Sequence, residues 1–214
     1  MTMNDNPIGW AGRLMEWLQF GTRLVLVNIL FVAGALAGLV LFGLFPAAVA
    51  ATTVLARLRA GAAGDHLVRD FITAYRAQFL HVNRVGSVFW LAGVVLFVNA
   101  HSVLGRPAGG SVPAVEAVLL VLSAVAGAGT LAAAATAVAI CSRYRDTVYR
   151  TWRLAFLLPL VSPLMSISLL ASLVALTVVF SGMNVLVPLF GASVPLLLSG
   201  WLVGRRLGTL ETAA

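Results

Sequence analysis

Residues Phe42–Gly86, FGLFPAAVAATTVLARLRAGAAGDHLVRDFITAYRAQFLHVNRVG, interrupt an otherwise apolar chain and decide its fold. An apolar run ends at Gly43 and Pro46, because proline lacks an N–H group and clashes with the preceding helical turn. The apolar pattern then resumes over residues 43–58, which are too few for an upright membrane span of about 20 residues. We therefore predict a break in the helix at Gly43 and Pro46.

A basic amphipathic helix is predicted directly after this segment, over residues 65–84. Leu67, Phe71 and Tyr75 recur at helical spacing, whereas the arginines fall largely on other faces. Basic amphipathic helices of this kind lie at a membrane surface or against a partner protein. We expect this helix on the cytoplasmic side.

The composition places the whole chain in a membrane. Of its 214 residues, 61% are hydrophobic and 10% charged, and the mean hydropathy is +1.01. A soluble domain carries about 25% charged residues. No stretch is long enough for a soluble nucleotide-binding or catalytic domain. The prediction is an all-α, polytopic membrane helical bundle with one membrane domain, 1–214.

About six membrane segments are expected, with five as the alternative. An interfacial lead-in at 10–20, which carries two tryptophans, precedes them. The predicted segments are 24–41, 43–58, 85–103, 114–140, 154–180 and 185–203.

The number of segments depends on what the chain does at the break. If it turns back as a hairpin, only Arg106 lies outside; if the first helix continues, kinked, then Arg13 and Arg23 lie outside as well. The positive-inside rule favours the hairpin. It places both chain ends in the cytoplasm, and we expect a multi-pass protein of the bacterial cytoplasmic membrane without a cleaved signal peptide.

Small residues mark the expected helix contacts. Gly34 and Gly38 form a GxxxG pattern that lets another backbone approach closely, and Gly127 lies in a segment crowded with glycine and alanine. Asn28, a polar residue in the first segment, is expected to hydrogen-bond a neighbouring helix.

The net charge of +7 comes from arginine alone, since the chain has no lysine. These arginines occupy short connections beside apolar segments, where anionic lipid and cytoplasmic orientation explain them better than nucleic acid does. Two basic connections stand out as candidate contacts with lipid headgroups or a partner. Their candidate residues are Arg57, Arg59, Arg69, Arg76, Arg143, Arg145 and Arg150.

No catalytic, metal or cofactor site is predicted. The three histidines have no metal-ligand spacing, and the acidic residues are scattered. A serine elbow, a Gly-rich phosphate loop and paired carboxylates are all missing from the sequence. Cys141, the single cysteine, cannot form an internal disulfide and is interpreted as a small packing residue. We expect that the protein is not an enzyme.

Two stretches carry a resemblance to a known family. FGLFPAAVAA stands where the YesL family of bacterial membrane proteins, defined by a domain of unknown function, has a "GPATAA"-like stretch, and FITAYRAQFLHVNRVG follows it. CSRYRDTVYRTWRLAFL is similar to that family's "RY-(E/D)-(N/T)" helix before its last two segments. The chain departs from the family at Ala48, where threonine is frequent.

The resemblance implies a role rather than a reaction. YesL-like genes stand beside genes for carbohydrate ABC importers, which implies an accessory membrane protein that assists oligosaccharide import by contacting permease subunits. The alternative is a small sugar transporter or channel, motivated by the prolines of the last two segments. Against ion-coupled transport, no ionisable residue lies at the centre of an expected segment.

Overall fold

The computed structural model describes residues 10–61, 66–104, 114–182 and 191–211, and every regular element in these ranges is an α-helix. The prediction of an all-α fold is confirmed. The helices, in chain order, are α1 (Trp10–Ala37), α2 (Leu44–Arg59), α3 (Leu67–Ala77), α4 (Phe79–Leu104), α5 (Ala114–Arg143), α6 (Val148–Val161), α7 (Pro163–Gly182) and α9 (Ser193–Glu211).

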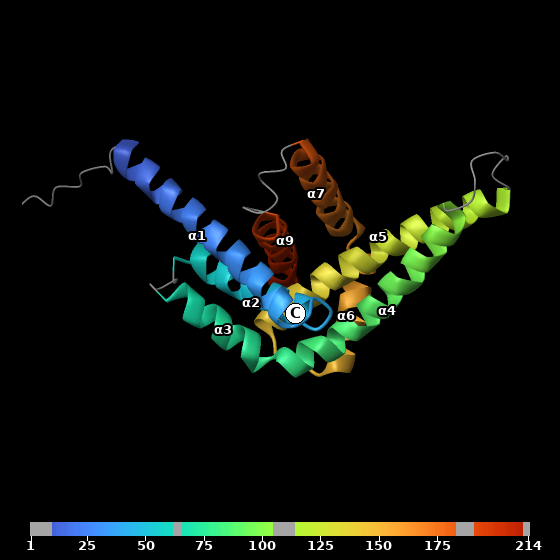
Figure 1. Cartoon of the computed structure of the whole chain (residues 1–214), viewed down its shortest axis with the longest axis horizontal. Helices are drawn as coiled ribbons and strands as arrows, with labels where there is room; N and C mark the ends of the chain where they lie inside the picture. The colour runs from blue at the N-terminus through green and yellow to red at the C-terminus, as the bar shows by residue number, and fades with distance from the viewer. Residues whose placement is uncertain (1–9, 62–65, 105–113, 183–190, 212–214) are drawn as a thin grey trace, which may run out of the picture.

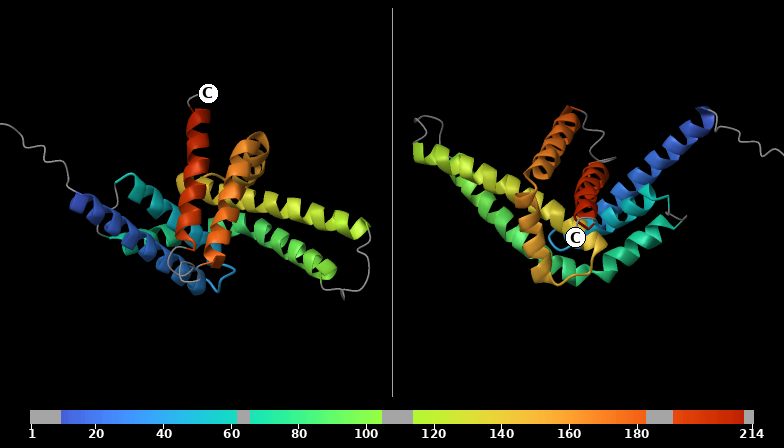
Figure 2. Two further views of the ribbon diagram at one scale, coloured as in Figure 1. Left: turned by 90° about the horizontal axis from the view of Figure 1, so that it is seen from above. Right: turned by 180° about the vertical axis from the view of Figure 1, so that it is seen from behind.

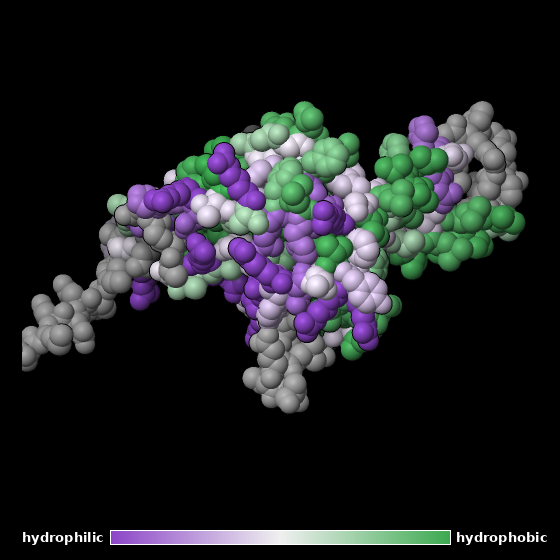
Figure 3. Space-filling model, turned by 90° about the horizontal axis from the view of Figure 1, so that it is seen from below, coloured by the Kyte–Doolittle hydropathy of each residue, from purple (hydrophilic) through white to green (hydrophobic). Residues whose placement is uncertain are grey.

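The helices form two arms that meet at a common base (Figure 1). One arm is the antiparallel pair α4 and α5, and the other is α1 with α2 and α3 beside it. Two further views show α7 and α9 standing between the arms (Figure 2). Seen from below, hydrophilic residues gather over the base and the α1–α3 arm, while the α4–α5 arm is largely hydrophobic (Figure 3).

Three helical stretches in the described ranges are long and apolar enough to cross a membrane: Gly12–Ala37, Phe79–Ser102 and Ala117–Arg143. The pair α6 and α7 passes the same test together, and the number of candidate spans rises to four if this bent pair is counted as one. These helices are compatible with a multi-pass membrane protein. The expected number of about six segments is not confirmed. One reason is α2, whose 16 residues span about 24 Å, less than the ~30 Å of a bilayer core.

Two further boundaries differ from those expected. The interfacial lead-in 10–20 is continuous with the first membrane segment in α1, where Trp10 and Trp17 are exposed. The sixth segment was expected over 185–203, but α9 begins at Ser193 and continues through Glu211. Residues 185–190 lie outside the described part of the chain.

The chain reverses between α1 and α2, as the hairpin interpretation predicts, but the turn starts earlier than Gly43. Leu39 and Val40 have positive φ angles of 54° and 64°. Their N–H groups donate to the carbonyls of Leu36 at 2.9 Å and Ala35 at 2.8 Å, the two bonds of a Schellman motif. Glycine usually occupies the left-handed position that Leu39 holds here.

Close backbone approach explains the two glycines of this turn. A Cβ atom on Gly38 would overlap the backbone of Gly43, and one on Gly43 would overlap the carbonyl of Ala35. Gly38, expected as a helix-packing residue, therefore serves the turn. Pro46 lies in the first turn of α2, where a missing N–H leaves no helical hydrogen bond unmade, so it starts this helix rather than breaking one.

The short helix α2 is the centre of the molecule. It contacts α1, α3, α4, α5 and α9, and Ala47, Ala50 and Ala51 are fully buried. One hydrophobic cluster joins α2 to α1 and α3, and a second joins it to α4, α5 and α6. The small side chains of α2 allow five neighbours to pack around one helix.

The expected amphipathic helix 65–84 is divided in the structure. It breaks at Gln78, where φ is −127°, so that α3 ends at Ala77 and α4 begins at Phe79. The break follows from packing, because α3 joins the cluster with α1 and α2, whereas α4 joins the cluster with α5 and α6. The third membrane segment consequently begins before residue 85.

The expected segment 154–180 is also divided, because α6 and α7 meet at an angle of 91°. Pro163 lacks the N–H that would have bonded the carbonyl of Pro159, four residues earlier. The hydroxyl of Ser166 donates to that carbonyl instead, at 2.9 Å. A local side chain thus satisfies the backbone oxygen that the bend releases.

The α5 helix packs tightly over only part of its length. Ala132, Ala133 and Ala137 are buried, and this half contacts α2, α6, α7 and α9. Gly127, expected at a helix contact, has only Leu96 Cδ1 near the position of a Cβ, at 4.0 Å. Its half of α5 faces α4 on one side and is exposed elsewhere.

Candidate functional site

Arg57 and Arg59 lie in the last turn of α2 and attach it to two different neighbours. Residues two apart on a helix do not share a face. The Arg57 guanidinium forms an ion pair with Asp70 of α3 at 3.4 Å. The Arg59 guanidinium lies 5.9 Å from the ring centre of Trp201 in α9. The end of α2 is therefore held between α3 and α9.

A polar cavity of about 250 Å³ opens on the Arg57 side of α2. We call it the arginine cleft. Helices α2 and α3 form two of its sides, and the end of α5 with the connection after it forms the third. Its lining residues are Val49, Thr53, Arg57, Asp70, Thr73, Ala74, Ala77, Gln78, Ser142, Arg143 and Arg145.

Positive charge prevails in the arginine cleft. Three arginines, Arg57, Arg143 and Arg145, are among its lining residues, and Asp70 is the single carboxylate among them. The arginine side chain stays charged in proteins. The Arg57–Asp70 pair is partly exposed, with 54% and 35% of the two side chains accessible, so Asp70 neutralises Arg57 only in part.

Gln78, one of the residues that line this cleft, has an unsatisfied acceptor. Its Oε1 atom is buried and has no hydrogen-bond partner among the described residues. Gln78 stands at the break between α3 and α4, and its backbone carbonyl accepts the first hydrogen bond of α4, from Val82 at 2.8 Å. A buried acceptor without a donor is costly.

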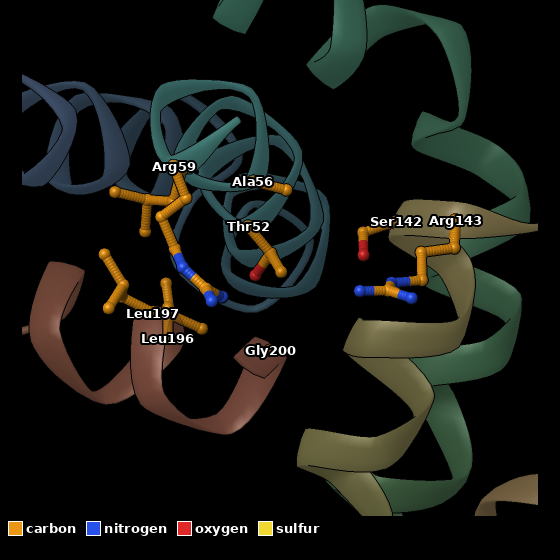
Figure 4. Close-up of a pocket in the computed structure, with 9 residues that line it drawn as sticks. Thr52, Ala56, Arg59, Ser142, Arg143, Leu196, Leu197 and Gly200 are labelled. Atoms are coloured by element: carbon orange, nitrogen blue, oxygen red, sulfur yellow. The ribbon is translucent and has the colours of Figure 1, made fainter. Parts of the chain in front are cut away.

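Arg143 also borders a second, smaller cavity beside α2 (Figure 4). This cavity, of about 20 Å³, lies between α2, α5 and α9, and Arg59 and Arg143 extend into it from two sides. Its volume suits a single water. The Arg143 guanidinium packs against Gly204 of α9, where any Cβ atom would overlap it.

The other candidate arginines lie apart from the cleft. Arg69 and Arg76 are exposed on α3, and Arg150 pairs with Asp146 at 3.2 Å on α6. The structure therefore brings Arg57, Arg143 and Arg145 together, and leaves the rest on the surface. In the described residues, no three His, Cys, Asp or Glu side chains are grouped so as to hold a metal ion.

Four residues of this region were not among the sequence candidates: Asp70, Gln78, Trp201 and Arg205. Asp70 and Gln78 line the cleft. The Trp201 ring contacts the guanidinium of Arg59 and also that of Arg205, which lies 4.7 Å from the ring centre. The four-residue spacing of Trp201 and Arg205 could have indicated their contact. Nothing local marks Gln78, because its role depends on a break that packing imposes.

Comparison with known proteins finds one family over the first half of the fold. Residues 24–100 match the model of a family described as "Protein of unknown function, DUF624". The matched stretch contains the second half of α1, all of α2 and α3, and most of α4. It includes Arg57, Asp70 and Gln78 of the arginine cleft, whereas Arg143 and Arg145 lie beyond it.

A relative from Bacillus subtilis (strain 168) supports the same relationship. The chain is 28% identical over 96 residues to the "Uncharacterized protein YteU". That match covers 45% of this chain and 42% of YteU, so it spans less than half of either protein. No solved structure matches the chain.

Proposed function

We propose that the chain is an integral membrane accessory protein that assists carbohydrate import by contacting the permease subunits of an ABC importer. The supporting observation is a set of exposed basic and aromatic residues on α3 and at the start of α6. Arg69 and Arg76 contribute to it from α3, and Arg150 and the 75%-exposed Tyr149 contribute from the start of α6. Arginine and tyrosine are enriched in protein interfaces.

The proposal includes the identity and placement of the whole chain. It assigns the full length to the matched family, with the YesL-like resemblance seen in two sequence stretches. It also places the protein in the bacterial cytoplasmic membrane, with both ends in the cytoplasm and about six membrane segments. Anionic headgroups would then lie next to the arginine surface.

Co-purification with a permease pair encoded beside this gene tests the proposal. The tagged protein is extracted in mild detergent, and bound permease subunits are identified by mass spectrometry. The triple variant Arg69→Gln/Arg76→Gln/Arg150→Gln should lose them. Arg13→Gln/Arg23→Gln, which removes charges from α1 instead, should retain them. Recovery of the wild-type protein alone would contradict a docking role.

A second function, a small solute transporter or channel, is favoured by the bend between α6 and α7. Broken helices with freed backbone groups occur in membranes where they line a cavity or pack against protein. Here the break carries Pro159, Pro163 and the Ser166 hydroxyl. Oligosaccharide uptake into liposomes containing the purified protein tests this function, and absence of any flux above that of empty liposomes would exclude it.

A further inference from the structure

We infer that the turn between α1 and α2 lies among the acyl chains of the membrane instead of emerging into water on the far side. The two helices then form a hairpin that enters and leaves the membrane at one surface. The inference rests on the proposed placement of the chain in a membrane, but not on a role in import.

The turn presents apolar side chains outward. Leu41 and Phe42 are 52% and 60% exposed. No polar side chain occurs between Asn28 and Thr52, although turns in water are rich in Asn, Asp and Ser. Exposed apolar patches mark contact with a membrane or with another protein. Lipid is favoured here because the turn directly continues the candidate span Gly12–Ala37.

The backbone of the turn is suited to lipid, which offers no hydrogen-bonding partners. Several of its N–H groups donate to backbone carbonyls of the same hairpin at 2.7–3.3 Å: those of Gly38, Leu39, Val40, Leu41, Phe42 and Leu44. Gly38 and Gly43 are also buried within the turn. These N–H groups therefore need no acceptor from water or from another protein.

The arginines of the hairpin limit how far it extends. No charged residue occurs over 24–56, whereas Arg23 precedes this stretch and Arg57 and Arg59 follow it. Even if α2 stood upright, its 16 residues would place the turn about 24 Å from Arg59, less than the ~30 Å of the hydrocarbon core. With Arg59 at one membrane surface, the turn thus stays inside the hydrocarbon.

The charged groups near the hairpin lie away from the turn. The left view of Figure 2 shows the turn and the C-terminal end of α9 on opposite sides of the molecule. The Arg59 guanidinium, at the other end of α2, contacts Trp201 of α9. In α3, Phe71 is buried against α1 and α2, whereas Arg69 and Arg76 are exposed on other faces.

Nitroxide spin labels test where the turn lies. The full chain with Cys141→Ala receives one new cysteine, Leu41→Cys or Phe42→Cys, and is labelled and placed in liposomes. Collision of the label with oxygen, which dissolves in hydrocarbon, is compared with collision with a water-soluble nickel chelate. Both labels should collide more with oxygen than with the chelate, because water and its solutes are excluded from the hydrocarbon.

Two matched positions calibrate the ratio of these collisions. Val95→Cys labels an exposed residue of the candidate span in α4 and should give the same oxygen-dominated ratio as the turn. Thr73→Cys labels an exposed residue of α3, outside the candidate spans, and should give the reverse ratio. Testing Leu41 and Phe42 separately keeps the experiment decisive if one variant does not fold.

Three outcomes would overturn the inference. Chelate collision at Leu41→Cys equal to that at Thr73→Cys, with Val95→Cys protected, would place the turn in water and leave the membrane placement intact. Chelate collision at Val95→Cys as well would refute the membrane placement itself. Low collision with both reagents at the turn would show that protein, such as a second copy of the chain, covers it instead of acyl chains.

Discussion

Asn28 in the middle of α1 accepts two hydrogen bonds from the start of α9, 164 residues further along the chain. Its Oδ1 atom lies 2.9 Å from the backbone nitrogen of Ala192 and 3.3 Å from that of Ser193. Asn28 is 1% exposed. The first N–H groups of a helix have no partner within it, so this amide acts as a cap supplied by another helix. The expected contact between Asn28 and a neighbouring helix is confirmed.

Replacing Asn28 by alanine should destabilise the protein by about 1–3 kcal/mol, because two buried N–H groups lose their acceptor. Asn28→Asp keeps the acceptor oxygen at a helix N-terminus, which favours negative charge. This variant should therefore lose less stability than Asn28→Ala does. The unfolding midpoint in detergent is the measurement. Equal losses in both variants would contradict the capping role.

Cys141 provides a direct probe of unfolding. It is the single cysteine of the chain and is 2% exposed against the core formed by α2, α4 and α5. A polar maleimide should therefore label the folded protein slowly and the denatured protein at once. Fast labelling of the folded protein would show that this part of α5 is not packed as described.

The turn between α1 and α2 predicts opposite effects at two positions. Gly43→Ala should abolish the native turn or cost several kcal/mol, because its Cβ overlaps the Ala35 carbonyl. Leu39→Gly should be neutral or stabilising, by up to about 1–2 kcal/mol, because it relieves a left-handed conformation. Maleimide labelling of Cys141 during a thermal scan measures both.

Gly127→Ala is the matched control for the turn. Its Cβ would meet only Leu96, at 4.0 Å, so the change should be neutral or stabilise α5 by about 1 kcal/mol through helix propensity. If Gly127→Ala were as damaging as Gly43→Ala, then helix contacts rather than the turn would explain both glycines.

Tyr75 attaches α3 to the end of α1, since its hydroxyl donates to the carbonyl of Gly34 at 2.9 Å. Tyr75→Phe should cost about 0.5–1.5 kcal/mol, whereas Tyr149→Phe, at an exposed position, should cost almost nothing. A denaturant titration measures both values.

The hydroxyl of Tyr75 also predicts a dependence on pH. Burial raises the pKa of Tyr75 above its ordinary value of 10.0. Its contribution to stability is therefore complete below pH 10 and is lost as the pH rises through the folded-state pKa. Tyr75→Phe should remove this loss at alkaline pH. A loss that is unchanged in the variant would assign it to another group.

The bend between α6 and α7 depends on Ser166. Ser166→Ala leaves the Pro159 carbonyl without its side-chain donor and should cost about 0.6–1.7 kcal/mol, the range for hydrogen bonds within membrane proteins. Ser181→Ala is the control, because that hydroxyl donates at an exposed position in α7. Matching losses in the two variants would mean that the Ser166 bond does not support the bend.

Local sequence determined which parts of this chain form apolar helices. Long apolar runs bounded by arginine predict membrane helices without any knowledge of their partners, because the bilayer alone requires satisfied backbone groups and apolar surfaces. Gly43 and Pro46 located the interruption to within a few residues, because glycine allows the close backbone approach of the turn and proline suits the first turn of the helix after it. The candidate set also included the three arginines that line the cleft, since it was drawn from the two basic connections.

Only the tertiary structure decided how these elements are used. Packing places the short α2 helix at the centre of the molecule and divides the predicted helix 65–84 at Gln78. It also brings Arg57 to the same cleft as Arg143 and Arg145. Helical periodicity describes one helix at a time, whereas a cleft depends on which helices pack together. The Asn28 cap on α9 has the same origin, because hydrogen bonds across 164 residues depend on packing that no local pattern contains.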